Sequence, residues 1–180
     1  MTNFQVHLAY RREKDKFVKK IHDSKIKIKL KYEFDIKIYE SLFDNTEQIV
    51  LSKGNINNGK PVLVRVHVTD YFDNLFGEYG SDDASLNKSV EVIQEHRRGI
   101  LVLIRDSGKS IINRLITSSS SGGNKSQNDT DELRIYGMGA QILSELGVKD
   151  MILLTNTEWK FIGLEAYGIN IIETKLLSDL

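Results

Sequence analysis

The chain has 180 residues, 40% of them hydrophobic and 28% charged, which predicts one domain with its own core and leaves too little length for two. Its 25 basic and 25 acidic residues give a formal net charge of zero, so no overall field favours nucleic acid or an anionic membrane. Cysteine is absent, which excludes disulfides and thiolate metal sites, and no apolar run is long enough for a membrane span or a signal segment, so we expect a cytoplasmic protein.

The first predicted element is a basic segment at residues 9–20, with the sequence AYRREKDKFVKK. Its lysines and arginines surround a few apolar residues, a pattern typical of a short surface helix or a linker. A run of this kind also occurs at RNA and phosphate sites, but a solvated face is the simpler interpretation. We therefore assign residues 1–24 to a basic linker or N-terminal helix and residues 25–180 to the folded domain.

The next segment alternates with period two. Lysine occupies each odd position from 25 to 31 and an apolar residue each even position from 26 to 38, which predicts a half-buried antiparallel strand or hairpin. Asn57, Asn58 and Gly59 then predict a tight turn into a strand at residues 61–68. A helix at about residues 85–96 and a continuous, buried strand at 100–104 follow.

In the second half of the chain, predicted strands again alternate with predicted helices. Residues 117–130 contain no aliphatic or aromatic side chain and predict a mobile loop. An amphipathic helix follows and ends at Gly147, and the chain closes with a strand at 151–155, a helix at 158–166 and a strand at 169–174. The elements together predict an α/β fold, a single domain with a mixed central β-sheet flanked by helices.

The segment DELRIYGMGAQILSEL, residues 131–146, has two interpretations. Arg134 follows Glu132 at the predicted helix entrance and precedes Gly137 and Gly139, and a guanidinium beside exposed backbone amides suits an anion. The second interpretation is an ordinary amphipathic helix, since its apolar residues recur at spacings of three and four. The apolar residues are Met138, Ile142, Leu143 and Leu146.

Four blocks, in order over about residues 25–175, resemble the GTP cyclohydrolase II family of riboflavin biosynthesis. The blocks are KPVLVRVH, RRGILVLIRDSGK, DELRIYGMGAQILSELGV and LLTNTEWKFIGLEAYGINIIE. The basic segment also resembles the connection in bifunctional members, where a dihydroxybutanone phosphate synthase domain precedes the cyclohydrolase. The resemblance implies a cyclohydrolase II-like domain, a homodimer, GTP or a related nucleotide as ligand, and an N-terminal synthase domain as partner.

The family's cofactors are zinc and magnesium, and its zinc is held by three cysteines in a Cys-x10-Cys-x-Cys loop. The corresponding positions here are Asp70, Ser81 and Asp83, which do not supply the soft thiolates that match zinc. Asp70, Asp73, Asp82 and Asp83 are carboxylates of the type that gathers magnesium or calcium, but an acidic surface loop is the simpler interpretation. We therefore predict no metal site and no cofactor.

The resemblance assigns roles to further residues. Arg134 occupies the position of the family's arginine nucleophile, and Glu132 that of the aspartate that accepts a proton. The residues that the resemblance implies would contact GTP are Arg65, Gly108, Lys109, Thr155 and Lys160. Ser107 and Thr69 stand where the family has carboxylates, so the nucleotide contacts are incomplete. His67, beside this set, has two interpretations, as a structural histidine or as a metal ligand.

These observations leave three functions open. In the first, the domain is degenerate, does not open the ring of GTP with zinc, and is retained as a structural or dimerisation domain. In the second, it is an enzyme that opens GTP with a nonthiolate metal or cleaves only its phosphate through Arg134 and Glu132. In the third, it is a regulatory module that binds a nucleotide. The missing cysteines favour the first.

Overall fold

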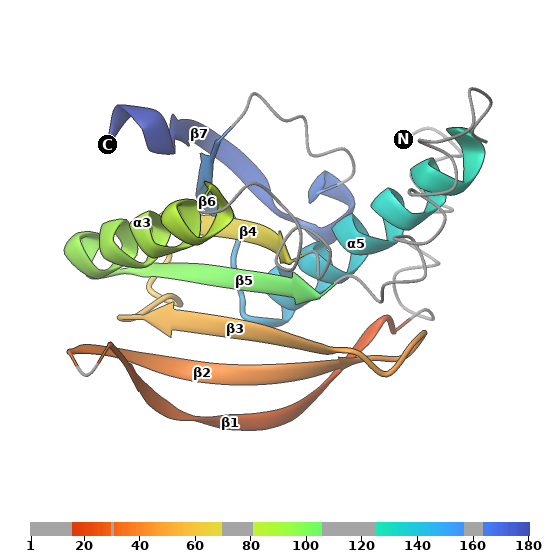
Figure 1. Cartoon of the computed structure of the whole chain (residues 1–180), viewed down its shortest axis with the longest axis horizontal. Helices are drawn as coiled ribbons and strands as arrows, with labels where there is room; N and C mark the ends of the chain where they lie inside the picture. Colours follow the sequence, from red (N-terminus) through yellow and green to blue (C-terminus); the bar gives the residue numbers. More distant parts are fainter. Residues whose placement is uncertain (1–15, 30, 70–80, 106–124, 157–163) are drawn as a thin grey trace.

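The computed structural model describes residues 16–29, 31–69, 81–105, 125–156 and 164–180, with the side chains of 81–83 and 125–133 left undescribed (Figure 1). Its strands are β1 (Val18–Ile28), β2 (Tyr32–Ser41), β3 (Glu47–Lys53), β4 (Val62–Thr69), β5 (Gly99–Arg105), β6 (Asp150–Thr155) and β7 (Asn170–Leu176). Its helices are α3 (Ser81–His96), α5 (Lys125–Glu145) and the short 3₁₀ turns η1 (Leu164–Tyr167) and η2 (Leu177–Asp179).

The strands form one mixed, seven-stranded sheet in the order β1-β2-β3-β5-β4-β6-β7. β1, β2, β3 and β5 pair antiparallel, whereas β5, β4, β6 and β7 run parallel to one another. Figure 1 shows β1 to β3 stacked along one side of the molecule, with β1 outermost. The prediction of an α/β domain with a mixed sheet and flanking helices is confirmed.

The two helices cover opposite faces of the sheet. Val64 and Ile104 belong to the core cluster beneath α5, and the intervening positions, such as Leu63 and Leu101, belong to the cluster beneath α3. Because successive side chains of a strand point to opposite faces, β4, β5 and β6 are buried on both sides, whereas the edge strand β7 is largely exposed. This explains the continuous apolar runs in the sequences of β4 and β5.

Several predicted bounds shift in the structure. The basic segment predicted as a helix or linker enters β1 at Val18, so its last residues are strand, and β1 crosses the predicted domain boundary at residue 24. β1 is also exposed on both faces, with Ile21 and Ile26 at 44% and 38%, so the predicted half-burial is wrong for this strand. β1 ends the sheet, and β2 is the one described strand that pairs with it.

The α helices begin earlier than predicted. α3 starts at Ser81 rather than near residue 85, and α5 starts at Lys125, so residues 125–130 are helical and not part of a loop. The remainder of the predicted loop, and residues 157–163 of the predicted last helix, lie outside the described residues. None of the helices that the structure describes is both long and apolar enough to cross a membrane.

Candidate functional site

The connections of the chain place a reversal of strand order between β4 and β6. From β4 the chain passes through α3 to β5 on one side, and the next described strand, β6, lies on the other side of β4. In open α/β sheets of this kind, ligands bind outside the carboxyl ends of the strands at the point of reversal. The carboxyl ends of β4 and β6 are therefore where a site is expected.

The ladder between β4 and β6 is short. It pairs Val62–Val64 with Met151–Leu153 and stops there, although β4 continues to Thr69 and β6 to Thr155. Arg65, the next residue of β4, donates from Nη1 to the carbonyl oxygen of Leu154 at 3.3 Å. Where the backbone pairing between β4 and β6 ends, the buried Arg65 side chain thus supplies the hydrogen bond to the Leu154 carbonyl oxygen of β6.

The Arg65 guanidinium also reaches helix α3. Its Nη2 donates to Ser85 Oγ at 3.4 Å, and Asn156 Nδ2, just beyond the end of β6, donates to the same oxygen at 2.8 Å. Arg65 is 8% exposed, Ser85 is half-buried and Asn156 is exposed. We call Arg65, Ser85 and Asn156 the carboxyl-edge cluster; it leads from the protein interior to solvent.

The other predicted site residues are divided between the two faces of the sheet. His67 is buried two residues after Arg65 and therefore lies with it on the α3 face. Thr155, which is also buried, follows Leu154 of the α3-side core and therefore points to the α5 face. The structure places Arg65 and Thr155 near the same strand ends but on opposite faces of the sheet.

Arg134 does not stand at a helix entrance, which corrects the prediction. It lies within α5, half-buried and four residues before the buried Met138, on the side of the helix that meets the sheet. The backbone amides around it belong to the helix interior, where they serve the helical ladder rather than an external anion. Glu132 lies in the same helix, and its side chain is outside the described residues.

The two glycines of α5 allow close packing instead of anion binding. A Cβ atom at Gly139 would approach Ile104 Cδ1 of β5 to 3.2 Å, and one at Gly137 would approach the ring of Phe17 to 3.4 Å. The amphipathic-helix interpretation is confirmed here, since Met138, Ile142 and Leu143 are all buried. The glycines let the helix lie near the sheet on one side and near the entry to β1 on the other.

The family's metal positions give a donor set that does not fit zinc. Asp70 and the predicted GTP contacts Gly108, Lys109 and Lys160 lie outside the described residues. Ser81 and Asp83 both lie in the first turn of α3, and their side chains are outside the described part of the chain. Hydroxyl and carboxylate oxygens also lack the softness of thiolates, so we assign no chemical step to a metal.

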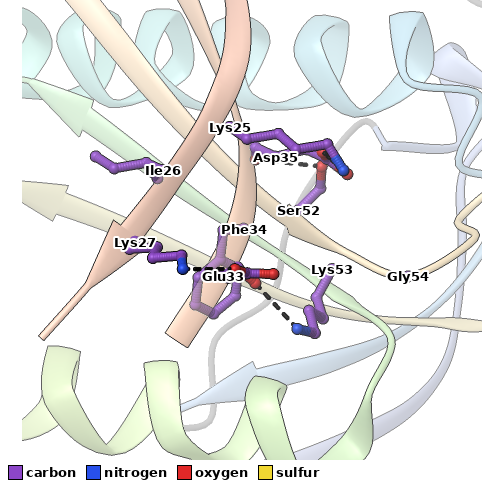
Figure 2. A pocket seen from close by; sticks show the side chains of 9 residues that line it. All are labelled: Lys25, Ile26, Lys27, Glu33, Phe34, Asp35, Ser52, Lys53 and Gly54. Carbon is purple, nitrogen blue, oxygen red and sulfur yellow. Dashed lines mark hydrogen bonds and ion pairs between the residues drawn. The ribbon is translucent and has the colours of Figure 1, made fainter. Parts of the chain in front are cut away.

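A pocket of about 430 Å³ lies at the other end of the sheet, between the β1–β2 hairpin and the end of β3 (Figure 2). Its charges are paired with one another: Lys25 Nζ lies 3.5 Å from Asp35, and Lys27 Nζ lies 3.1 Å from Glu33. The hydrogen bond from Lys27, and then its charge, hold the pKa of Glu33 below its ordinary value. These exposed pairs explain the local charges, so we do not take this pocket as the site.

Sequence reasoning missed two members of the carboxyl-edge cluster. The sequence indicates Ser85 only as the start of a helix, and no pattern marks Asn156, although it stands beside Thr155 in the sequence TNTEWK. The position of Asn156 directly after a predicted parallel strand was a usable signal, since such positions gather at one edge of a sheet. Ser85 carried no comparable signal, because its partner Asn156 is 71 positions away.

Comparison with known proteins places this chain in a family. The model of the GTP cyclohydrolase II family matches residues 19–175. The monofunctional riboflavin biosynthesis protein RIBA 3, chloroplastic, of Arabidopsis thaliana is 35% identical over 92% of this chain and 34% of its own length. The riboflavin biosynthesis protein RibBA of Chlorobium phaeovibrioides is 34% identical over 92% of this chain and 43% of its own length. The chain thus spans less than half of either relative.

A solved structure supports the fold. RibBX of A. baumannii, a two-domain 3,4-dihydroxy-2-butanone 4-phosphate synthase, superimposes with a TM-score of 0.56 at 20% identity, over 96% of this chain and 43% of that one. The predicted resemblance is confirmed by the family match and by both sequence relatives. This chain belongs to the GTP cyclohydrolase II family.

Proposed function

We propose that this chain is a cyclohydrolase II-like domain of riboflavin biosynthesis that has lost the zinc-dependent ring opening of GTP and serves as a structural or dimerisation domain. One observation carries the proposal: the 180 residues contain no cysteine, and the family's three zinc positions hold Asp70, Ser81 and Asp83. Zinc bound by a suitable ligand set lowers the pKa of its water to about 7 and so supplies hydroxide at neutral pH. The oxygen donors at these positions do not form that ligand set.

The structural role that we propose involves a larger assembly. Both sequence relatives are more than twice as long as the matched segment, and the structural relative is a two-domain synthase. We infer that this domain accompanies an N-terminal dihydroxybutanone phosphate synthase domain and forms homodimers. Its core is well packed and its sheet is of a common mixed type. These features suit a domain that supplies a contact surface to the assembly rather than a catalytic site.

A second candidate function is nucleotide binding without ring opening. It is favoured by the buried Arg65, whose charge is held at the strand ends by the carbonyl oxygen of Leu154 and the hydroxyl of Ser85. A guanidinium is a group that binds phosphate, and Arg65 lies with Ser85 and Asn156 near the sheet edge at which α/β folds bind their ligands.

Metal analysis beside a product assay tests the proposal. Protein purified without chelator is assayed for zinc, and its reaction with GTP is followed for formate and for pyrophosphate separately. A cysteine-bearing family member, treated identically, is the positive control. We expect no stoichiometric zinc and no formate; formate release would refute the loss of ring opening, whereas pyrophosphate alone would identify phosphate cleavage through Arg134 and Glu132.

A further inference from the structure

The outer edge of β7 is an open strand edge. β7 ends the sheet, and within the described part of the chain β6 is the one strand that pairs with it. Figure 1 shows β7 on the side of the sheet opposite to β1. Residues 170–174 are all exposed, and Ile172 is 53% exposed. An edge of this kind presents backbone N–H and C=O groups with which another strand can pair.

β7 lacks the lysines that cover the other edge strand. β1 carries lysine at positions 19, 20, 25 and 27, whereas the seven residues of β7 include a single lysine, Lys175, and a single acidic residue, Glu173. Two copies of β1 would repel one another, because like charges on neighbouring strands are destabilising. The charges of β7 sum to zero, so no net repulsion opposes the pairing of two copies of this strand.

The regular part of β7 follows a bulge. The register with β6 shifts at this point, since Met151 pairs with Ile171 and Ile152 pairs with Glu173. A bulge bends an edge strand and interrupts its pairing locally. From Glu173 to Leu176 the register is unbroken. A further strand would therefore pair with this last part of β7.

The charges of this part are self-complementary. When two identical strands pair antiparallel about a twofold axis, the residue at the axis faces its own copy, and the residues before and after it face each other. An axis at Glu173 would oppose two glutamates, and an axis at Lys175 would oppose two lysines. An axis at Thr174 places Glu173 of each copy opposite Lys175 of the other, which is the favourable arrangement.

The same axis also matches apolar side chains on the other face of the sheet. It places Ile172 of each copy opposite Leu176 of the other, and these side chains alternate with the charged ones along the strand. Within one copy, Lys175 Nζ lies 3.7 Å from Glu173 Oε1, so the two charges already share a face. Pairing would bring two such pairs together with opposite charges facing across the axis.

We infer that β7 is the surface through which two copies of this chain associate, antiparallel and centred on Thr174, so that their two sheets become one continuous sheet. The inference names the contact surface of the homodimer in the proposed function and rests on that part of it. Backbone hydrogen bonds along the edge would hold the two copies together, and the charges of Glu173 and Lys175 would fix the register.

Charge reversals on β7 test the inference. Glu173→Lys opposes like positive charges across the axis, and Lys175→Glu opposes like negative ones. In sedimentation velocity of the full chain, we expect each reversal to raise the dissociation constant of the dimer roughly tenfold or more. Glu33→Lys is the matched control, since it makes the same change at an exposed ion pair on β2, and it should leave dimerisation unchanged. Thermal unfolding of every variant is recorded in parallel.

Mixing the two variants separates a contact between copies from an effect within one copy. Each variant keeps two like charges at positions 173 and 175, whether alone or mixed. In a mixed dimer, however, the positive side chains of one copy face the negative side chains of the other. We expect an equimolar mixture of Glu173→Lys and Lys175→Glu to dimerise with a dissociation constant close to that of the unaltered chain.

Amide hydrogen exchange of the unaltered chain tests the same surface without any substitution. We expect the amides of β7 to exchange more slowly at concentrations above the dissociation constant than below it. Exchange rates of β7 that do not depend on concentration would overturn the inference. So would dimerisation that the reversals leave unchanged, or a loss of dimerisation that mixing does not recover.

A monomeric unaltered chain would overturn the inference together with the proposed dimerisation. A dimer that is insensitive to the reversals would refute only the β7 surface, so the two failures are distinguishable. None of these results bears on the proposed loss of ring opening, which is decided by formate release.

Discussion

Gly147 ends α5 with a backbone conformation that other residues adopt only under strain. Its φ is +80°, its N–H donates to Ser144 O at 3.0 Å, and the next amide, of Val148, donates to Leu143 O at 3.1 Å. These bonds form a Schellman motif, which satisfies carbonyls that the last turn would leave unpaired. Replacing Gly147 by alanine should lower the free energy of unfolding by about 1 kcal/mol through backbone strain alone.

The same substitution also creates a contact. A Cβ atom at position 147 would lie 2.7 Å from Asn57 Oδ1, whereas one at Gly59, with a similar φ of +74°, would meet nothing within 4 Å. Gly59→Ala therefore serves as the control for strain without contact. In urea unfolding we expect Gly147→Ala to be the more destabilising change, and Asn57→Ala to recover the difference in the double variant. Equal effects of the two glycine substitutions would contradict this account.

Gln48 joins two strands from a fully buried position. Its Oε1 accepts from the backbone N–H of Arg105 at 2.7 Å, at the carboxyl end of β5, and its Nε2 donates to Thr46 Oγ1 at 2.7 Å. Gln48→Leu keeps the volume but leaves these partners without the bonds. We expect it to reduce the free energy of unfolding by about 1–3 kcal/mol.

The control for Gln48 is Gln48→Glu, which keeps an oxygen for Arg105 N–H and loses only the donation to Thr46. At a pH low enough to protonate the new carboxyl, Gln48→Glu should be closer in stability to the unaltered chain than Gln48→Leu is. Chemical denaturation of all three proteins at acidic and neutral pH measures this order. If Gln48→Leu is as stable as the unaltered chain, the bond to Arg105 does not stabilise the end of β5.

Among the elements, α5 shows what local patterns reveal and what they omit. Its second half was predictable, because its apolar residues recur at helical spacing up to a glycine. Its first half carries no such pattern, since residues 125–133 are nearly all polar, and the sequence favoured a loop there. Helix formation is cooperative, so a well-packed turn near Ile135 can extend into a polar segment that would not nucleate a helix itself.

The candidate site was predictable to a similar extent. Thr155 ends β6, where the apolar run before it predicts the end of a strand, whereas Arg65 lies in the middle of β4. The carboxyl-edge cluster could not be predicted, since it joins Ser85 to Asn156 across 71 positions, and a hydrogen bond between distant side chains leaves no local pattern. The position of Arg134 depended on where α5 begins, and helix starts are among the least certain features of a sequence.

Strand β2 contains a tyrosine whose ionisation makes the stability of the fold depend on pH in the alkaline range. Tyr39 is 1% exposed; burial first, and then the negative charges of Glu145 and Asp23, raise the pKa of its hydroxyl well above the ordinary value. Lys20 and Lys37 also line this region and offset part of the negative charge. The pKa of Tyr39 is thus higher in the folded chain than in the unfolded chain, where it is about 10. Below about pH 10 Tyr39 does not change the stability of the fold. Above that pH the unfolded chain ionises more readily than the folded chain, so the stability falls as pH rises.

We therefore expect the urea midpoint to fall more steeply above pH 10 in the unaltered chain than in Tyr39→Phe, which cannot ionise. Tyr32→Phe on the same strand is the control, since Tyr32 is half-buried and lies beside the turn of the β1–β2 hairpin, paired with Ile28. Its pH profile should follow that of the unaltered chain. Parallel profiles for Tyr39→Phe and the unaltered chain would mean that ionisation of Tyr39 does not limit alkaline stability.

At the scale of the whole molecule, the sheet is open at both ends, with β1 and β7 as edge strands. An edge strand presents unpaired backbone groups that can pair with another chain, and proteins commonly protect such edges with lysine. β1 has Ile21 and Ile26 exposed, but lysines flank them at positions 20, 25 and 27. Two copies of β1 brought side by side would bring these lysines together, so the edge discourages its own pairing.

This protection can be removed with little effect on the fold. Lys25 and Lys27 form exposed pairs with Asp35 and Glu33, and pairs of that kind contribute little to stability because water and salt screen them. Lys25→Thr/Lys27→Thr should therefore stay folded while it gains β propensity and loses repulsion along β1. We expect sedimentation velocity to show concentration-dependent self-association in this variant beyond any present in the unaltered chain.

The control is Lys60→Thr/Lys149→Thr, which removes the same charge from exposed positions outside every strand. Because net charge also governs solubility, an equal rise in association for both variants would assign the effect to total charge and not to the β1 edge. A rise confined to the β1 variant would show that the lysines prevent β1 from pairing with another copy of the chain. Dimerisation of the unaltered chain would then have to use another surface, since the charges that limit pairing at β1 are present in every copy.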